Sequence, residues 1–145
     1  MSQTKAYSPT VVDAECFCLN LKRAARAIAR RYDDALQPFE LTSGQFSTLI
    51  AISGMQPVSM QALAELLVMD RTTLTATLKP LKRRGLVMIA IDAADRRGRQ
   101  LRLTDAGTAL AHQALPRWQE LQQRITRDIG ASAATTLRSQ LAHLV

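Results

Sequence analysis

Most of the chain spaces its apolar residues three and four positions apart, which places them on one face of an α-helix. The longest of these stretches lie towards the two ends of the chain, at residues 11–36 and 104–129. Pro38 follows the first stretch and ends it, and Pro116 should kink the second because its ring removes a backbone hydrogen bond. Ser132 is then expected to cap a short last helix.

The middle of the chain has the pattern of a helix-turn-helix. A short helix comes first, and its apolar face is formed by Ala62, Leu63, Leu66 and Leu67. After a break at residues 68–70, a second helix ends at Gly85, which readily adopts a left-handed conformation, and carries an apolar stripe of Leu74, Leu78 and Leu81. Before this motif, Thr42 and Gln45 form a capping box. The helix that they begin should bury Phe46, Leu49, Ile50 and Ser53.

The residues after the second helix predict a β-hairpin. Residues 86–91 are an apolar run with Val and Ile, and residues 100–103 alternate polar and apolar side chains, so both segments are expected to be strands. The turn between them, residues 92–99, contains three arginines. A helix-turn-helix followed by a basic-tipped hairpin is a winged helix. Its second helix would enter the major groove of DNA while the hairpin reaches the neighbouring backbone or minor groove. The predicted fold class is therefore mainly α with a small β-hairpin wing.

Several short segments, in this order, are similar to the MarR family of bacterial transcription regulators: LAEL at residues 63–66, DRTTLT at 70–75, LKRRGLV at 81–87, DRRG at 95–98 and LTDAG at 103–107. The resemblance implies one MarR-like domain over residues 1–145. Within it, residues 42–103 would form a winged helix-turn-helix lobe, and the helices at residues 11–36 and 104–145 would form a dimerisation body. It also implies that the protein is a homodimer with a small aromatic or phenolic ligand as its effector.

The excess of positive charge is concentrated in the same central segment. Of the net charge of +7, residues 54–103 carry +5, from nine Lys or Arg against four Asp or Glu. A basic surface gathered on one unit is typical of polyanion binding, which indicates double-stranded DNA as the partner. No apolar run is long enough to span a membrane, and the N-terminus lacks the apolar core of a secretory signal. We therefore expect a cytoplasmic protein without a membrane partner.

The outer face of the second helix carries the residues expected to contact DNA. Its first turns meet base edges, where Arg can donate two bonds to guanine and Thr offers a hydroxyl and a methyl group. Thr is a poor helix former, so a cluster of threonines on an exposed helix indicates a function. The candidates for base contacts are Arg71, Thr72, Thr73 and Thr75, and those for phosphate contacts are Lys79 and Lys82. Asp70 is expected to cap the helix.

The turn of the hairpin carries Arg96, Arg97 and Arg99. Three neighbouring positive charges repel one another unless an anion binds there, so these arginines are candidates for DNA contacts, with Arg97 directed at the minor groove. Asp95 is expected to pair with Arg97 and to hold the loop, the roles that the matching Asp and Arg have in similar proteins.

Cys16 and Cys18 lie two positions apart in the first predicted helix, where side chains at this spacing point about 200° apart and cannot form a strain-free disulfide. With no CxxC motif and no nearby His, no metal site is expected. Cys18 shares an apolar stripe with Leu21 and Ile28, so we expect it to be buried and mainly structural. The peroxide-sensing branch of the MarR family has its reactive cysteine at the matching position, fourteen residues before a Tyr that matches Tyr32. A second tyrosine of that branch is replaced here by Ser43.

The sequence has no Ser-His-Asp set, no glycine-rich phosphate loop and no carboxylate pair suited to catalysis, so it indicates neither an enzyme nor a cofactor. The function that it favours is a sequence-specific repressor that binds a palindromic operator as a homodimer and is released by a small effector. Two alternatives stay open. One is an organic-hydroperoxide-sensing repressor that uses Cys18, and the other is a non-specific nucleoid-type DNA-binding or protein-interaction module.

Overall fold

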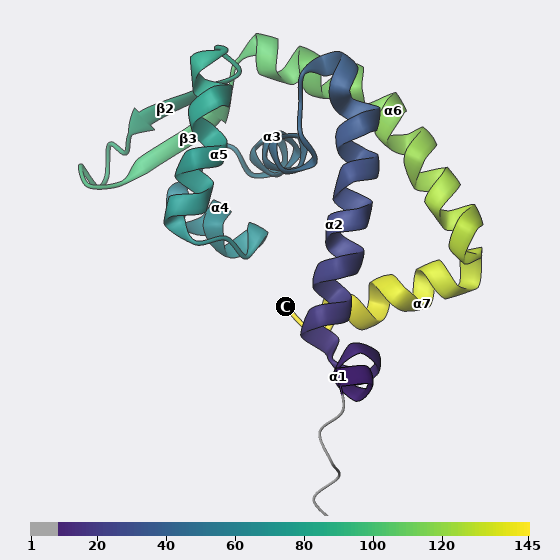
Figure 1. Cartoon of the computed structure of the whole chain (residues 1–145). Coiled ribbons are helices and arrows are strands. Elements are labelled where there is room, and N and C mark those ends of the chain that lie inside the picture. The colour runs from purple at the N-terminus through teal and green to yellow at the C-terminus, as the bar shows by residue number, and fades with distance from the viewer. Residues whose placement is uncertain (1–8) are drawn as a thin grey trace, which may run out of the picture.

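The structure is a computed structural model that describes residues 9–145 (Figure 1). Its helices are α1 (Pro9–Glu15), α2 (Phe17–Leu36), the 3-10 helix η1 (Gln37–Phe39), α3 (Ser43–Met55), α4 (Met60–Leu67), α5 (Arg71–Arg83), α6 (Asp105–Ile129) and α7 (Ala131–Ala142). Its strands are β1 (Val58–Ser59), β2 (Val87–Ile91) and β3 (Arg99–Leu103), which form an antiparallel sheet in the order β1–β3–β2. The predicted class, mainly α with a hairpin wing, is confirmed.

Two parts of the molecule are joined through α3 (Figure 1). On one side α2 packs against α6, and α7 turns back from the end of α6 towards the start of α2. On the other side lies the winged lobe, which we define as β1, α4, α5, β2 and β3; its β2–β3 hairpin projects outward. Because α3 contacts α2, α5 and α6, one continuous core runs through both parts. Its fully buried members include Leu36, Leu49, Ile52, Leu63, Leu74, Leu81 and Leu101.

The local signals read from the sequence are confirmed at several helix ends. Gln45 N–H donates to Thr42 Oγ1 over 3.2 Å, and Thr42 N–H donates to Gln45 Oε1 over 3.0 Å, which completes the capping box. Thr104 caps α6, and Gly85 follows α5 with a φ of 71°. These bonds satisfy backbone N–H groups that a helix end leaves unpaired.

The expected buried faces of α3 and α4 are partly wrong. Phe46 and Leu49 are buried as predicted, but Ile50 is 40% exposed and Ser53 is exposed, while Thr48 and Ile52 are buried in their place. The reason is that α3 packs against the four helices α2, α4, α5 and α6 and against β3, which changes the face that it buries. Thr48 tolerates burial because its hydroxyl donates to Gly44 O over 2.8 Å. In α4, Leu63 is buried, but Leu66 points outward and is 54% exposed.

The first predicted helix, residues 11–36, is two helices, because the chain breaks at Cys16. Cys16 has an extended ψ of 105°, and its sulfur accepts a hydrogen bond from Leu19 N–H over 3.4 Å, so it caps α2. The corner is held by an ion pair between Arg23 and Asp13 at 2.6 Å. Cys18 then lies at the start of α2 and is exposed, which corrects the prediction that it is buried.

Two further expectations change at α6 and α7. Gly130, with a φ of 94°, ends α6 and is itself the residue before α7, so the predicted cap Ser132 lies inside α7. The helix α6 continues through Pro116 as one element and arches around α2 and α3 (Figure 1).

The sheet also has a strand that the pattern did not predict: β1, whose Val58 pairs with Leu101. Two residues are too short to show an alternation.

Gly107, in the first turn of α6, lies directly against the backbone of Leu86. A Cβ atom at Gly107 would stand 2.0 Å from Leu86 O and 2.9 Å from its carbonyl carbon. Neither atom is the flexible end of a side chain, so any larger residue would have to push α6 away from the lobe.

We therefore predict that Gly107→Ala lowers the free energy of unfolding by roughly 3 kcal/mol, the upper range for overpacking a core. Gly44→Ala is the matched control, because a Cβ there has nothing within 4 Å and Ala favours a helix more than Gly does. Urea unfolding followed by circular dichroism measures both variants. Equal stabilities for the two alanine variants would contradict the proposed contact.

Candidate nucleic-acid interface

The turn between α4 and α5 orients the second helix of the helix-turn-helix. Val68 adopts a left-handed φ of 50°, and Met69 N–H donates to Ala64 O over 2.9 Å, so the chain reverses within three residues. Asp70 then caps α5, as predicted, by accepting a hydrogen bond from Thr73 N–H over 2.7 Å. This bond, with a second one from the Thr73 hydroxyl, holds the pKa of the Asp70 carboxyl below its usual value. The first turn of α5 is therefore locally fixed.

The outer face of α5 is defined by the side that it buries. Leu74, Leu78 and Leu81 are at most 2% exposed. At 3.6 residues per turn, the positions opposite these leucines are Thr72, Ala76, Lys79 and Arg83, with Arg71, Thr73, Thr75 and Lys82 along the flanks. All eight are exposed. Ala76 was missed from the sequence, although extending the helical period from the leucines to the opposite face would have found it.

Most threonine hydroxyls of α5 are bonded within the helix. The Thr73 hydroxyl donates to Asp70 Oδ2 over 2.9 Å, that of Thr75 to Arg71 O over 2.8 Å, and that of Thr77 to Thr73 O over 3.0 Å. Among the described residues, Thr72 is the one threonine of α5 whose hydroxyl has no hydrogen-bond partner. Each of these three hydroxyls therefore has a hydrogen-bond acceptor within α5 or at its cap, so the threonines are accommodated without a partner outside the helix.

Two aspartates shape the wing. Asp95 Oδ1 accepts from Arg97 N–H over 3.0 Å, and Asp95 O accepts from Gly98 N–H over 2.8 Å. The expected pairing of Asp95 with Arg97 thus takes place at the backbone, which leaves the guanidinium free of it. Asp92, which the sequence reasoning missed, accepts from Gln100 Nε2 over 2.8 Å and from Ala94 N–H over 2.9 Å. These bonds, led by the one from Gln100, lower the pKa of the Asp92 carboxyl.

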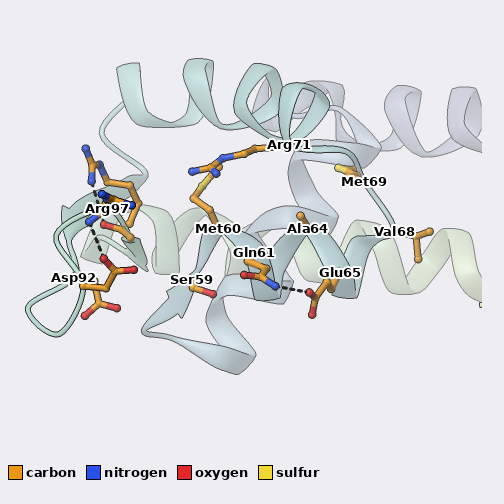
Figure 2. A pocket seen from close by; sticks show the side chains of 13 residues that line it. Ser59, Met60, Gln61, Ala64, Glu65, Val68, Met69, Arg71, Asp92 and Arg97 are labelled. Atoms are coloured by element: carbon orange, nitrogen blue, oxygen red, sulfur yellow. Dashed lines mark hydrogen bonds between the residues drawn. The ribbon is translucent and has the colours of Figure 1, made fainter.

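A groove with a volume of about 840 Å³ separates α4 and the start of α5 from the wing. It brings together three of the predicted arginines, Arg71, Arg97 and Arg99. Figure 2 shows Arg71 reaching across the groove over Met60 towards the wing, where Arg97 lies. Carboxylates of Glu65, Asp92 and Asp95 also line it. The remaining candidates, Thr72, Thr73, Thr75, Lys79, Lys82 and Arg96, lie outside this groove.

The described residues contain no group of three or more His, Cys, Asp or Glu arranged to hold a metal ion. In the same part of the chain, no helix is both long and apolar enough to cross a membrane. What the fold and this surface define is a winged helix with an exposed, basic outer helix and a basic hairpin.

Comparison with known proteins agrees with this class. A family model described as MarR family matches residues 39–98. The transcriptional regulator TtmR of Methylorubrum extorquens is 34% identical over 110 residues, which is 76% of this chain and 56% of TtmR. The M. tuberculosis transcriptional regulator MosR, solved in complex with DNA, is 38% identical, with a TM-score of 0.82 over 90% of this chain and 93% of that one. The repressor CouR, bound to a 23-mer DNA duplex, is 27% identical, with a TM-score of 0.83 over 96% and 99%.

This chain belongs to the MarR family of winged-helix transcriptional regulators. The matched segment spans a little over half the length of the curated relative TtmR.

Proposed function

We propose that this chain is a sequence-specific DNA-binding repressor that acts as a homodimer on a palindromic operator, in the cytoplasm and without enzymatic activity. The observation that carries the proposal is the placement of two exposed basic elements, the outer face of α5 and the wing, on either side of one groove. The similar proteins MosR and CouR, which have been solved with DNA, support it.

In this proposal α5 enters the major groove with Arg71 and Thr72 towards base edges. The sugar-phosphate strand that borders the major groove would pass through the groove between α5 and the wing. Arg71 and Arg99 would flank it, and Arg97 would reach the adjacent minor groove. Lys79, Lys82 and Arg83, further along α5, suit phosphates. Glu65 and Asp95 in the same groove repel phosphate, so the strand must be held by the arginines.

The operator can be found by selecting bound DNA from a random library and then footprinting the selected site. A discrete palindromic footprint is expected, whereas continuous coating of DNA would favour a nucleoid-type protein. On that operator, Arg97→Ala should bind several-fold more weakly, and the slope of log affinity against log salt should fall by about two, because the dimer loses one DNA-neutralising charge from each of its two wings.

The matched control for Arg97→Ala is Arg117→Ala. Arg117 is an exposed arginine on α6, paired with Glu120 at 3.2 Å and remote from the winged lobe. Circular dichroism verifies that both variants are folded. Unchanged affinity in a folded Arg97→Ala protein would remove the wing from the interface.

A homodimer is supported by apolar side chains that the single chain leaves uncovered at the end of the molecule away from the lobe. They come from the start of α2, the end of α6, and α7 with the residues after it: Phe17, Leu21, Ile129, Leu137, Leu141 and Leu144. Phe17 is 84% exposed. In Figure 1, α7 runs back from the end of α6 towards the start of α2, so the segments that carry these residues lie at the same end of the molecule. Contact of this region with a second copy would cover them and would relate two winged lobes by symmetry, as a palindrome requires.

We predict that Leu141→Glu converts the dimer into a monomer, because a carboxylate would be buried without a partner at the interface. Leu66→Glu serves as the control, since Leu66 is a more exposed leucine located on α4 in the lobe. Light scattering measures the mass of both proteins. If the Leu141→Glu protein stays a dimer, α7 does not form the interface.

Release by a small effector is supported by a cavity of about 300 Å³ between α3 and α6. Phe46 and Trp118, whose ring centroids are 6.4 Å apart, line it together with Ile50, Ala51, Leu115 and Ser47. This lining suits an aromatic ring. The Ser47 hydroxyl donates to Ser43 O over 2.9 Å, so it would meet a polar group of the ligand as an acceptor. Because α3 also contacts α5, a ligand that moves α3 would shift the DNA-reading helix.

A thiol sensor is the second candidate, because Cys18 is exposed and therefore reachable by an oxidant. The Cys18 thiolate would attack a hydroperoxide oxygen, break the O–O bond and leave a cysteine sulfenic acid and an alcohol. The resemblance to the peroxide-sensing branch suggests that Tyr32 donates a hydrogen bond to this thiol from across the dimer. Within the chain its hydroxyl donates to Gln122 Oε1 instead, and burial raises the Tyr32 pKa.

One experiment separates the two modes of release. The complex of protein and operator is exposed in parallel to organic hydroperoxide and to a panel of aromatic acids, and DNA release is followed by fluorescence anisotropy. Effector control predicts release by an aromatic acid in both wild type and Cys18→Ser. Sensor control predicts release by hydroperoxide in wild type but not in Cys18→Ser. An absence of release under every condition would contradict both proposals.

A further inference from the structure

We propose that α5 recognises thymine in its operator through methyl contacts made by Thr75 and Ala76, while the threonine hydroxyls serve the helix. This inference rests on the proposed DNA-binding function and specifies the bases that the helix selects. It also assigns a role to an alanine, Ala76, although the DNA-contact candidates chosen from the sequence were all charged or polar residues.

The hydroxyl of Thr75 cannot donate to a base while it is bonded within α5. A hydroxyl has one proton to donate, and that of Thr75 is directed at Arg71 O over 2.8 Å. The same holds for Thr73, whose proton goes to Asp70 Oδ2. Releasing either proton to a base would leave its helix partner with one bond fewer. Thr75 can therefore meet a base with its methyl group, or with its hydroxyl oxygen as an acceptor only.

Ala76 lies close to the centre of the outward face of α5. It is two residues beyond Leu74, which helical geometry places about 200° around the axis from that buried leucine, and it is exposed. Its polar neighbours on the same face are Thr72, one turn before, and Lys79, one turn after. The Ala76 methyl group has no hydrogen bond to offer and gains free energy from burial against an apolar group. The methyl group that the major groove presents is the C5 methyl of thymine.

The alternative is that threonine hydroxyls read hydrogen-bonding groups on the bases. The two possibilities differ in which half of the Thr75 side chain matters. Thr75→Val keeps a methyl at the same position and removes the hydroxyl. Thr75→Ser keeps the hydroxyl and removes the methyl. Both substitutions lie on an exposed helix face, so neither opens a cavity in the core.

The test uses the operator selected by the wild-type protein and duplexes in which one thymine at a time is replaced by deoxyuridine, which lacks the methyl group. We expect a loss of about four-fold at each contacted thymine, the affinity equivalent of burying one methylene group. Thr75→Val should bind like wild type. Thr75→Ser should lose about sixteen-fold on the thymine operator, which is about four-fold for each of the two subunits, and become insensitive to deoxyuridine at one position of each half-site.

Ala76→Gly is tested on the same duplexes. If glycine destabilises α5, binding to the thymine and the deoxyuridine operators weakens by the same factor. A methyl contact by Ala76 is therefore indicated only if Ala76→Gly binds equally to thymine and deoxyuridine at a position other than the one assigned to Thr75. Wild-type affinity that no deoxyuridine changes, or weak binding by Thr75→Val with normal binding by Thr75→Ser, would overturn the proposal. Failure of the wild-type protein to select any operator would instead overturn the proposed DNA-binding function.

Discussion

The structure depends on the close contact between the first turn of α6 and the chain that leaves α5. Gly107 lies against Leu86 O, Thr104 N–H donates to the same oxygen over 3.1 Å, and the Thr104 hydroxyl donates to Gly85 O over 2.6 Å. Leu86 N–H in turn donates to Leu81 O over 3.0 Å. The end of α5, the start of β2 and the start of α6 are therefore joined at one point, and no side chain larger than hydrogen fits at Gly107.

Other contacts reinforce the connection between the helical part and the winged lobe. Arg84, just after α5, donates to Glu40 O over 2.6 Å and to Phe39 O over 3.1 Å, which ties the end of α5 to the corner between α2 and α3. On the far side, Arg31 pairs with Asp128 at 2.8 Å and holds α2 against α6. Because the core is continuous through α3, a change in the packing of α2, α3 and α6 has a direct route to the recognition helix. In the proposed function, this continuity is what allows a ligand or a partner subunit to alter the spacing of two DNA-reading helices.

The wing and α5 use different physical means to present their arginines. Asp95 and Asp92 accept backbone and amide hydrogen bonds that shape the hairpin turn, and the Arg99 guanidinium adds bonds to Arg96 O and Gly98 O, over 3.3 and 3.1 Å. Arg71 is held by its place in the first turn of α5, which Asp70 caps. Asp70 and Asp95 thus act through hydrogen bonds to backbone N–H groups rather than through ion pairs with Arg71 and Arg97. The positive charge of these two arginines is left for an anion.

The sequence alone determined the features that depend on local chemistry. The leucine stripe of α5, the capping box at Thr42, the cap at Asp70 and the left-handed Gly85 each involve residues within a turn or two of one another, so their patterns are legible without tertiary information. The tertiary structure decided what depends on neighbours distant in sequence. The exposure of Ile50 and Leu66 follows from which helices surround α3 and α4. Likewise, β1 forms only because Val58 meets Leu101, and the turn at Cys16, where α1 gives way to α2, leaves Cys18 exposed. Periodicity shows that a helix has an apolar face, but packing selects which of its residues that face buries.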